Sequence, residues 1–146
     1  MDEHSLIAEG WKPLPTIRYS AALGPTFSRV VEGQLEVCLL AQDHLGNDNL
    51  GIVHGGAMMT FGDMALGCAV GQVAAGQLFV TVQLQFQFVA AANVGTLVTC
   101  APQVVRRTSQ LVFVRGLIEN CGRPVASADG IFKLLDTEKA ARLRAD

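Results

Sequence analysis

The feature that most constrains the fold of this chain is a helix-length segment that is apolar on every side. Residues 57–75 place alanine, methionine, phenylalanine, leucine and valine all around a helical wheel rather than along one stripe. A helix with this pattern has to be surrounded by protein. Its glycines, Gln72 and Asp63 argue against a membrane span. We therefore predict a buried helix at the centre of one domain.

The segments on either side of this helix have the pattern of β-strands. In residues 80–88, VTVQLQFQF, valine, leucine and phenylalanine alternate strictly with Thr81 and glutamines, which predicts a strand with one apolar face. Two strands that turn near Gly33 precede the helix, and three more strands follow residue 88. The order predicts an α+β fold, in which an antiparallel sheet wraps around one long central helix.

Length and composition indicate one domain that associates with copies of itself. The 146 residues are divided into an N-terminal arm (1–25), a single domain (26–136) and a charged C-terminal tail (137–146). Only 16% of the residues are charged, so we expect another subunit to cover some apolar surface. The net charge of −2 supports neither a nucleic-acid partner nor an anionic membrane.

The N-terminus and the cysteines indicate a cytoplasmic protein. The first residues are acidic and lack the plan of a signal peptide. The four cysteines, at positions 38, 68, 100 and 121, form no CxxC pair. We expect buried free thiols in a reducing compartment, and we expect neither a zinc site nor another metal site.

Asp63 is the strongest candidate for a catalytic residue. Between Asp48 and Arg106 it is the only charged residue. An unpaired buried carboxylate costs roughly several kcal/mol, and no lysine or arginine lies nearby in the sequence to offset that cost. A structural alternative is a carboxylate that reaches solvent at a cleft or accepts a backbone hydrogen bond. We favour a general base or nucleophile.

The sequence His54-Gly55-Gly56 is a second candidate for a part of the catalytic site. It opens the predicted helix, where the first backbone N–H groups are free and lie at the positive end of the helix dipole. These groups can polarise a carbonyl oxygen, although a tight turn explains two glycines equally well. His54 and Asp63 are nine residues apart, which is roughly 13 Å along a helix and on opposite sides of it. Two chains around a twofold axis can bring Asp63 of one to Gly55 of the other.

The segment NLGIVHGGAMMTFGDMALG resembles the signature of hotdog-fold acyl-CoA thioesterases of the phenylacetic-acid-degradation type. The likeness extends over about residues 25–136. It implies hydrolysis of an acyl- or aryl-CoA, with Asp63 as base or nucleophile and the partner's Gly55 N–H polarising the thioester carbonyl. Coenzyme A is then part of the substrate, and no other cofactor is implied.

The resemblance also implies roles for further residues. His54 shapes the loop, and Asn49 orients water or substrate, with Asn47 and Asp48 as adjacent candidates. Thr81 corresponds to a residue that hydrogen-bonds near the carboxylate, but its register is that of the glutamines. It therefore requires a local bulge or a contact across subunits.

Substrate-binding residues are predicted around this centre. Gly56 adjoins the same loop, and Met59 belongs to a methionine-rich apolar lining that is equally compatible with plain core. Three residues of one turn, Arg106, Arg107 and Thr108, are placed by the resemblance at the nucleotide end of coenzyme A, although a solvated turn explains each one singly.

Two other functions are compatible with the same pattern. One is a hotdog dehydratase or hydratase acting on 3-hydroxyacyl thioesters, which needs a histidine paired with a carboxylate. The other is a non-catalytic module that binds acyl-CoA. In each case we expect a homodimer as the minimal unit, and we expect a homotetramer from the polar face of Gln83, Gln85 and Gln87.

Overall fold

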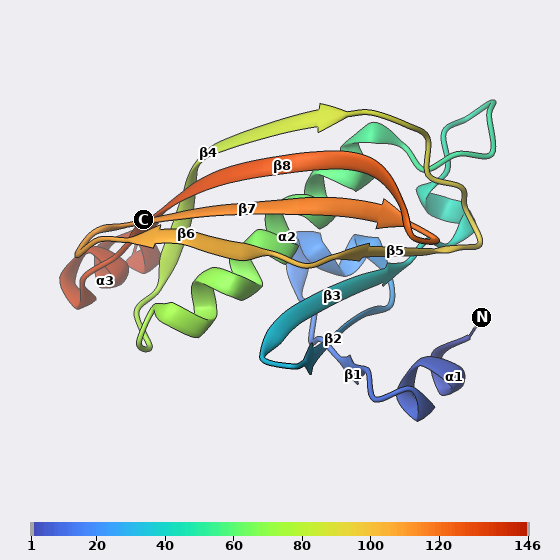
Figure 1. The fold of residues 1–146 in the computed structure, drawn as a ribbon. Coiled ribbons are helices and arrows are strands. Elements are labelled where there is room, and N and C mark those ends of the chain that lie inside the picture. The colour runs from blue at the N-terminus through green and yellow to red at the C-terminus, as the bar shows by residue number, and fades with distance from the viewer. Residues whose placement is uncertain (1, 146) are drawn as a thin grey trace.

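The computed structural model describes residues 2–145 and contains one antiparallel sheet with a long helix across one face (Figure 1). The strand order is β1-β2-β3-β5-β7-β8-β4, and β6 also pairs with β7. This arrangement confirms the predicted α+β fold with a central helix. The helices are α1 (Glu3–Ala8), α2 (Gly55–Val73) and α3 (Thr137–Ala145), with two 3-10 turns, η1 (Arg18–Leu23) and η2 (Asp43–Leu45). The strands are β1 (Lys12–Pro13), β2 (Thr26–Val31), β3 (Gln34–Leu40), β4 (Phe79–Phe88), β5 (Leu97–Cys100), β6 (Gln103–Arg107), β7 (Leu111–Asn120) and β8 (Arg123–Leu134).

Both ends of α2 are capped by side chains. His54 is the N-cap residue, and its Nδ1 accepts a hydrogen bond from the Gly56 N–H at 2.9 Å. At the other end the Arg107 side chain donates from Nε to the Val73 carbonyl at 3.0 Å. That carbonyl is one of the last four in the helix, which have no partner within the helix itself. Arg107 thereby joins the end of α2 to strand β6.

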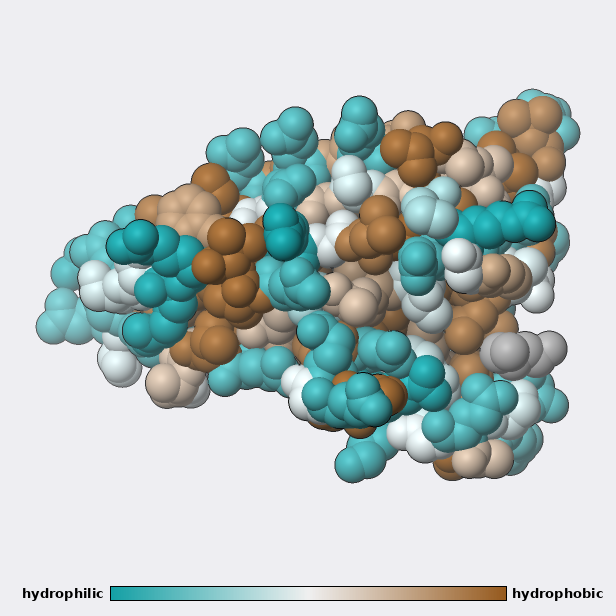
Figure 2. All heavy atoms as spheres, in the orientation of Figure 1, coloured by the Kyte–Doolittle hydropathy of each residue, from teal (hydrophilic) through white to brown (hydrophobic). Residues whose placement is uncertain are grey.

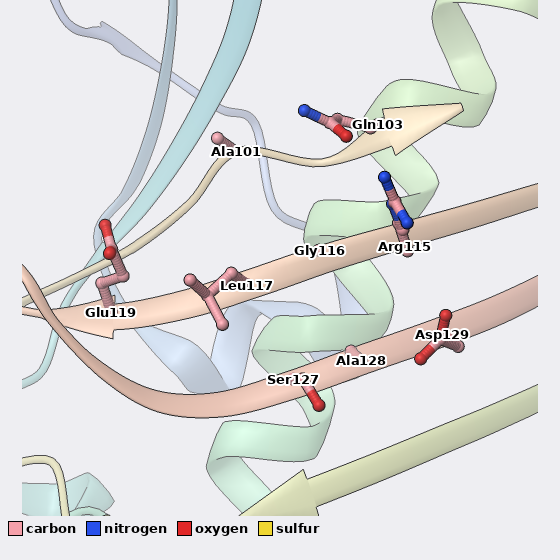
Figure 3. A pocket seen from close by; sticks show the side chains of 9 residues that line it. All are labelled: Ala101, Gln103, Arg115, Gly116, Leu117, Glu119, Ser127, Ala128 and Asp129. Atoms are coloured by element: carbon pink, nitrogen blue, oxygen red, sulfur yellow. The ribbon is translucent and has the colours of Figure 1, made fainter. Parts of the chain in front are cut away.

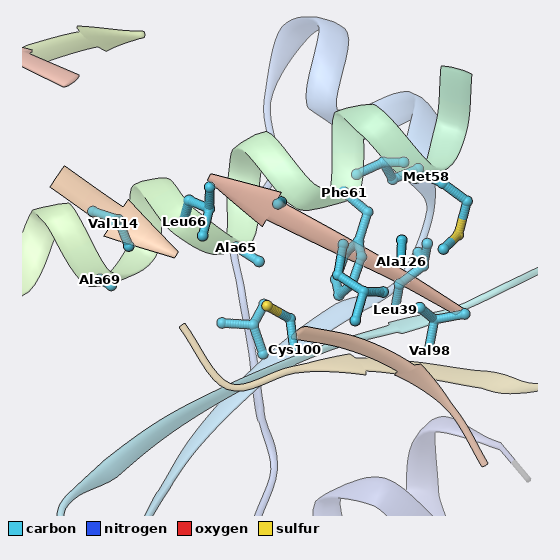
Figure 4. Packing of buried hydrophobic residues seen from close by; sticks show 14 of the residues in the cluster. Leu39, Met58, Phe61, Ala65, Leu66, Ala69, Val98, Cys100, Val114 and Ala126 are labelled. Carbon is cyan, nitrogen blue, oxygen red and sulfur yellow. The ribbon is translucent and has the colours of Figure 1, made fainter. Parts of the chain in front are cut away.

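The side of α2 that faces the sheet is packed without space for additional atoms. Leu66 lies over two glycines of adjacent strands, Gly116 in β7 and Gly130 in β8. A Cβ atom at Gly116 would lie 3.2 Å from Leu66, and one at Gly130 would lie 3.0 Å from it. Figure 4 shows Phe61, Ala65 and Leu66 directed from the helix into the cluster between helix and sheet. The two glycines let helix and sheet approach closely.

The opposite side of α2 remains accessible in the single chain. Gly56 and Gly71 are exposed there, and Thr60, Asp63 and Gly67 are only partly buried. The expectation that the helix is surrounded by protein therefore holds on the sheet side, whereas this side carries small and polar residues.

Strand β4 departs from strict alternation at its start. Thr81 and Gln83 pair with consecutive residues of β8, so Val82 is the extra residue of a β-bulge. Val80 and Val82 are 40% and 52% exposed. The prediction of one continuous apolar face over residues 80–88 is therefore wrong at its beginning. Because the bulge reverses the register, Thr81 lies on the helix side and the two valines do not.

Strands β5 and β6 are two parts of one predicted strand. Both pair with β7, but of the two only β5 also pairs with β3. Ala101 and Pro102 separate the two parts, and proline has no N–H to donate to a ladder. The N-terminal residues also join the fold: β1 pairs with β2, and Leu6 and Trp11 form a second apolar cluster with Phe27.

Candidate active site

Asp63 lies in the middle of α2, beside the first residues of β4. The Thr81 hydroxyl donates a hydrogen bond to Asp63 Oδ1 at 2.7 Å within the same chain. The β4 bulge permits this contact, since strict alternation would direct Thr81 away from the helix. Among residues 2–145 the Asp63 side chain has no second hydrogen bond and no ion pair. Its Oδ2 is therefore available to a substrate or a water molecule.

The start of α2 presents a backbone donor. Because His54 Nδ1 accepts the Gly56 N–H, the proton of the neutral ring is on Nε2. The Gly55 N–H has no acceptor in the described part of the chain, and it lies at the positive end of the helix dipole. A Cβ atom at Gly56 would lie 3.1 Å from His54 Nδ1, and one at Gly55 would lie 3.4 Å from the Phe88 ring. Glycine at both positions keeps this end of the helix open.

The loop before α2 carries the three candidate polar residues. It is closed by a hydrogen bond from the Asn47 N–H to the Ile52 carbonyl at 2.7 Å, and it projects from the body of the molecule (Figure 1). The Asn47 side chain is used inside the loop, because its Oδ1 accepts the Asn49 N–H at 3.4 Å. Asp48 and Asn49 are exposed in the turn. Their side chains are free to contact a ligand or a second chain.

Asn120 is a buried polar residue that the sequence did not single out. Its Oδ1 accepts the Asn93 N–H at 3.2 Å, and its Nδ2 donates to Thr96 Oγ1 at 2.7 Å and to the Leu97 carbonyl at 2.9 Å. Asn93 forms a β-bridge with Ile52, two residues before His54. Asn120 thus holds the segment against which the loop before α2 is paired. In the sequence it resembles a turn residue, because a cysteine and a glycine follow it.

Asp63 and the Gly55 N–H do not meet within one chain. Eight residues of helix separate them, which corresponds to roughly 12 Å along the helix axis. Within the described residues β4 pairs only with β8, so its other edge is open beside Asp63 and Thr81. An open strand edge is a template for pairing with another chain.

The predicted nucleotide-binding residues do not share one surface. Arg106 pairs with Phe113 and Arg107 with Val112, and residues opposite each other lie on the same face of a sheet. The two arginines therefore project to opposite faces, and Arg107 already contacts the end of α2. The Thr108 hydroxyl accepts the Leu111 N–H at 2.9 Å and is used within its turn. Met59, by contrast, is 39% exposed on α2.

The outer face of the sheet carries a hollow of about 490 Å³ that contains none of the predicted site residues (Figure 3). Arg115, Asp129 and Glu119 project beside it from β7 and β8, with Leu117 between them. Figure 2, which has the orientation of Figure 1, shows apolar side chains interrupted by polar ones on the face toward the viewer. This face is distant from Asp63 because α2 lies on the other side of the sheet.

The cysteines are not arranged for catalysis. Burial raises the pKa of the Cys38 and Cys100 thiols to about 12, and burial also raises the pKa of Cys68. Cys121 is exposed, so the expectation that all four thiols are buried is wrong at this position.

Among the described residues no group of three or more His, Cys, Asp or Glu side chains is placed to hold a metal ion. No helix within residues 2–145 is long and apolar enough to cross a membrane.

Comparison with known proteins defines the class. Residues 50–126 match the family described as the thioesterase superfamily, and this chain belongs to that family. A protein of Pseudomonas aeruginosa named a putative esterase is 32% identical over 132 residues, which cover 88% of this chain and 97% of that protein. The chain is thus a thioester hydrolase with the hotdog fold that its signature resembles.

Solved structures agree with this class. A Bacillus halodurans protein solved with coenzyme A is 31% identical, with a TM-score of 0.65 over 74% of this chain and 71% of that one. A Ralstonia eutropha protein described as a putative thioesterase related to phenylacetic acid degradation is 25% identical, with a TM-score of 0.70 over 90% of this chain and 99% of that one.

Proposed function

We propose that this chain hydrolyses an acyl- or aryl-CoA thioester to the free acid and coenzyme A, with Asp63 as the catalytic carboxylate. The observation that carries the proposal is the hydrogen bond from Thr81 to Asp63 Oδ1. It orients a lone carboxylate on the accessible side of α2 and leaves Oδ2 unoccupied. The Bacillus halodurans relative that binds coenzyme A supports a CoA thioester as substrate.

The reaction needs a base and a donor at one carbonyl group. Asp63 Oδ2 removes a proton from water while the water oxygen attacks the thioester carbon. The carbonyl oxygen becomes an oxyanion, which the Gly55 N–H of the partner subunit stabilises at the helix terminus. The C–S bond then breaks, and the proton passes from Asp63 to the leaving thiolate. Thr81 is a positioning residue, because its hydroxyl donates to the other carboxylate oxygen, Asp63 Oδ1.

The assembly that joins these groups is a homodimer. Pairing of two β4 strands across their open edges places the two α2 helices side by side, and the accessible side of each helix then becomes covered. Such a dimer brings Asp63 of each chain towards the partner's Gly55. We extend this to a tetramer through the outer faces of the sheets, where Leu117 is 47% exposed between charged neighbours. We place the enzyme in the cytoplasm.

The remaining predicted residues have supporting roles. His54 fixes the geometry of the helix start by capping Gly56, and to Asn49, which is exposed on the loop, we assign the orientation of water or substrate. Met59 contributes apolar surface near Asp63. At the nucleotide end, the Arg106 guanidinium has no hydrogen bond or ion pair with the residues that the structure describes, whereas Arg107 and Thr108 already contact the protein. We therefore assign phosphate contact to Arg106 first.

Thiol release from a panel of acyl-CoAs tests the proposal, with wild type and Asp63→Asn compared directly. The panel contains phenylacetyl-, hydroxybenzoyl-, acetyl-, hexanoyl- and palmitoyl-CoA. Release by the wild type that falls on the order of 10²–10⁴-fold in Asp63→Asn supports hydrolysis by this carboxylate. An Asp63→Asn variant that keeps most of its rate contradicts the mechanism. Transfer of ¹⁸O from water into the Asp63 carboxylate would identify it as a nucleophile rather than a base.

The same assays, with a 3-hydroxyacyl-CoA added to the panel, separate the alternative functions. Within the described part of one chain His54 contacts Gly56 and Asp63 contacts Thr81, so these two residues do not form the histidine–carboxylate pair that a dehydratase needs. Absorbance at the enoyl-thioester band without thiol release would nevertheless indicate a dehydratase. Tight binding of acyl-CoA without turnover would indicate a binding module.

A further inference from the structure

A cavity of about 380 Å³ opens beside the start of α2. Three short elements enclose it: η1, η2 and the first turns of α2. Leu23 and Leu45 are its buried apolar walls, being 2% and 7% exposed, and Ala57 contributes from the helix. Ligand sites are typically apolar hollows with a small number of placed polar groups. This cavity has that composition, since two histidines, Tyr19 and Thr60 also line it.

Hydrogen bonds between the enclosing elements hold the cavity in shape. His44 Nε2 lies 2.8 Å from the Ala22 carbonyl oxygen, and this hydrogen bond joins η2 to η1. The His54 N–H donates to the Leu45 carbonyl at 2.7 Å, which joins the start of α2 to η2. A carbonyl can only accept, so Nε2 of His44 carries a proton. The walls are therefore preformed rather than dependent on a ligand.

The two hydroxyl groups at the mouth of the cavity, those of Tyr19 and Thr60, together offer an acceptor rather than a donor. The Thr60 hydroxyl donates its proton to the Gly56 carbonyl at 2.9 Å. The Tyr19 hydroxyl lies 3.5 Å from Thr60 Oγ1, so in that contact Tyr19 is the donor and Thr60 the acceptor. The lone pairs of the Tyr19 oxygen remain free, and the side chain is 76% exposed at the mouth of the cavity. A ligand that reaches Tyr19 thus gains a hydrogen bond by bringing a donor.

We propose that this cavity binds the acyl part of the substrate and that Tyr19 determines specificity, favouring short acyl groups that carry a hydroxyl or another hydrogen-bond donor. The inference rests on the proposed function, because His54 and Gly56 line the cavity and also form the helix start where the thioester carbonyl is placed. The volume of the cavity is near the lower end of the roughly 300–1,000 Å³ that is usual for ligand pockets, and this small volume favours short acyl groups.

Matched pairs of substrates test the role of Tyr19. Rates are measured for hexanoyl- and 6-hydroxyhexanoyl-CoA and for phenylacetyl- and 4-hydroxyphenylacetyl-CoA. In Tyr19→Phe the ratio of kcat/KM for the hydroxylated over the plain member falls about tenfold, since one hydrogen bond is lost. Val30→Ala, an exposed change in β2, is the control and keeps the wild-type ratio. An unchanged ratio in Tyr19→Phe overturns selection by this residue.

Filling the cavity tests the subsite itself. Ala22→Phe places a ring in the cavity and leaves the backbone carbonyl that His44 contacts. It raises KM for hexanoyl-CoA about tenfold and for acetyl-CoA much less, because a two-carbon group needs little of the volume. Equal KM values for wild type and Ala22→Phe with both substrates overturn the acyl subsite.

Binding of the free acid separates this inference from the proposed hydrolysis. Calorimetry measures the affinity of 6-hydroxyhexanoate for the wild type and for Ala22→Phe. Absence of thiol release from every acyl-CoA contradicts the hydrolase mechanism. Even then, acid binding that Ala22→Phe weakens about tenfold supports the cavity as an acyl site. Acid affinity that is equal in both proteins contradicts it.

Discussion

The two sides of α2 have opposite requirements. On the sheet side, Leu66 fits over Gly116 and Gly130 so closely that one added carbon atom meets another side chain. On the accessible side, Asp63 has Thr81 as its one hydrogen-bond partner within residues 2–145 and contributes no apolar packing. The first side stabilises the fold, and the second carries a group that the fold does not need. Substitutions on the two sides should therefore separate activity from stability.

Asp63→Asn should have the largest effect on activity and almost none on stability. We expect turnover to fall on the order of 10²–10⁴-fold, while the free energy of unfolding stays equal or rises because a partly buried charge is removed. Steady-state thiol release and urea denaturation measure the two quantities. A variant that loses its rate because it unfolds would remove the distinction between the two sides.

Leu66→Ala should show the converse. Loss of a fully buried leucine costs roughly 2–5 kcal/mol of unfolding free energy, because a cavity forms between helix and sheet. The rate per folded molecule should remain within a few-fold of the wild type. Urea denaturation followed by circular dichroism measures the loss. Stability within 1 kcal/mol of the wild type would show that this side of α2 is less tightly packed than the structure indicates.

Gly130→Ala tests the same side by adding an atom instead of removing several. The new Cβ would lie 2.7 Å from the Phe132 ring and 3.0 Å from Leu66. Overpacking of this kind typically costs about 1–3 kcal/mol. Stability equal to that of the wild type in Gly130→Ala would contradict the close approach of helix and sheet.

Thr81→Val should have a smaller effect on activity. It keeps the shape of the side chain but removes the donor to Asp63, and we expect about a tenfold loss of kcat. Thr81→Ser restores the hydroxyl and most of the rate. A full rate in Thr81→Val would mean that the orientation of Asp63 is set elsewhere.

The thiols provide the mildest test. One thiol per chain, Cys121, should react rapidly with a disulfide reagent at pH 8, and Cys121→Ser should remove that reaction. Because burial raises the pKa of Cys38 and Cys100 from 9.0 to about 12, the folded state keeps protons that the unfolded state loses. Stability should therefore decrease as the pH rises from 9 to 12. Rapid reaction of more than one thiol in the folded protein would contradict their burial.

Parts of the candidate site were readable from the sequence because their signals are local. Asp63 is conspicuous as a single charge in a long uncharged segment, and the glycines after His54 mark the start of a helix. By contrast, Asn120 and Tyr19 carry no local signal. Their roles depend on segments that are distant in the chain, the loop at Asn93 for one and the first turns of α2 for the other.

The sequence by itself determined the central helix, the antiparallel sheet and the position of the carboxylate, because hydrophobic periodicity and charge are properties of neighbouring residues. Tertiary structure decided the bulge at Val82 and, with it, the contact between Thr81 and Asp63. A bulge depends on how β4 pairs with β8, and an alternating pattern such as VTVQLQFQF contains no mark of the extra residue. The division of α2 into a packed side and an accessible side was likewise decided by the sheet, since a helix that is apolar all round does not specify which side the strands will cover.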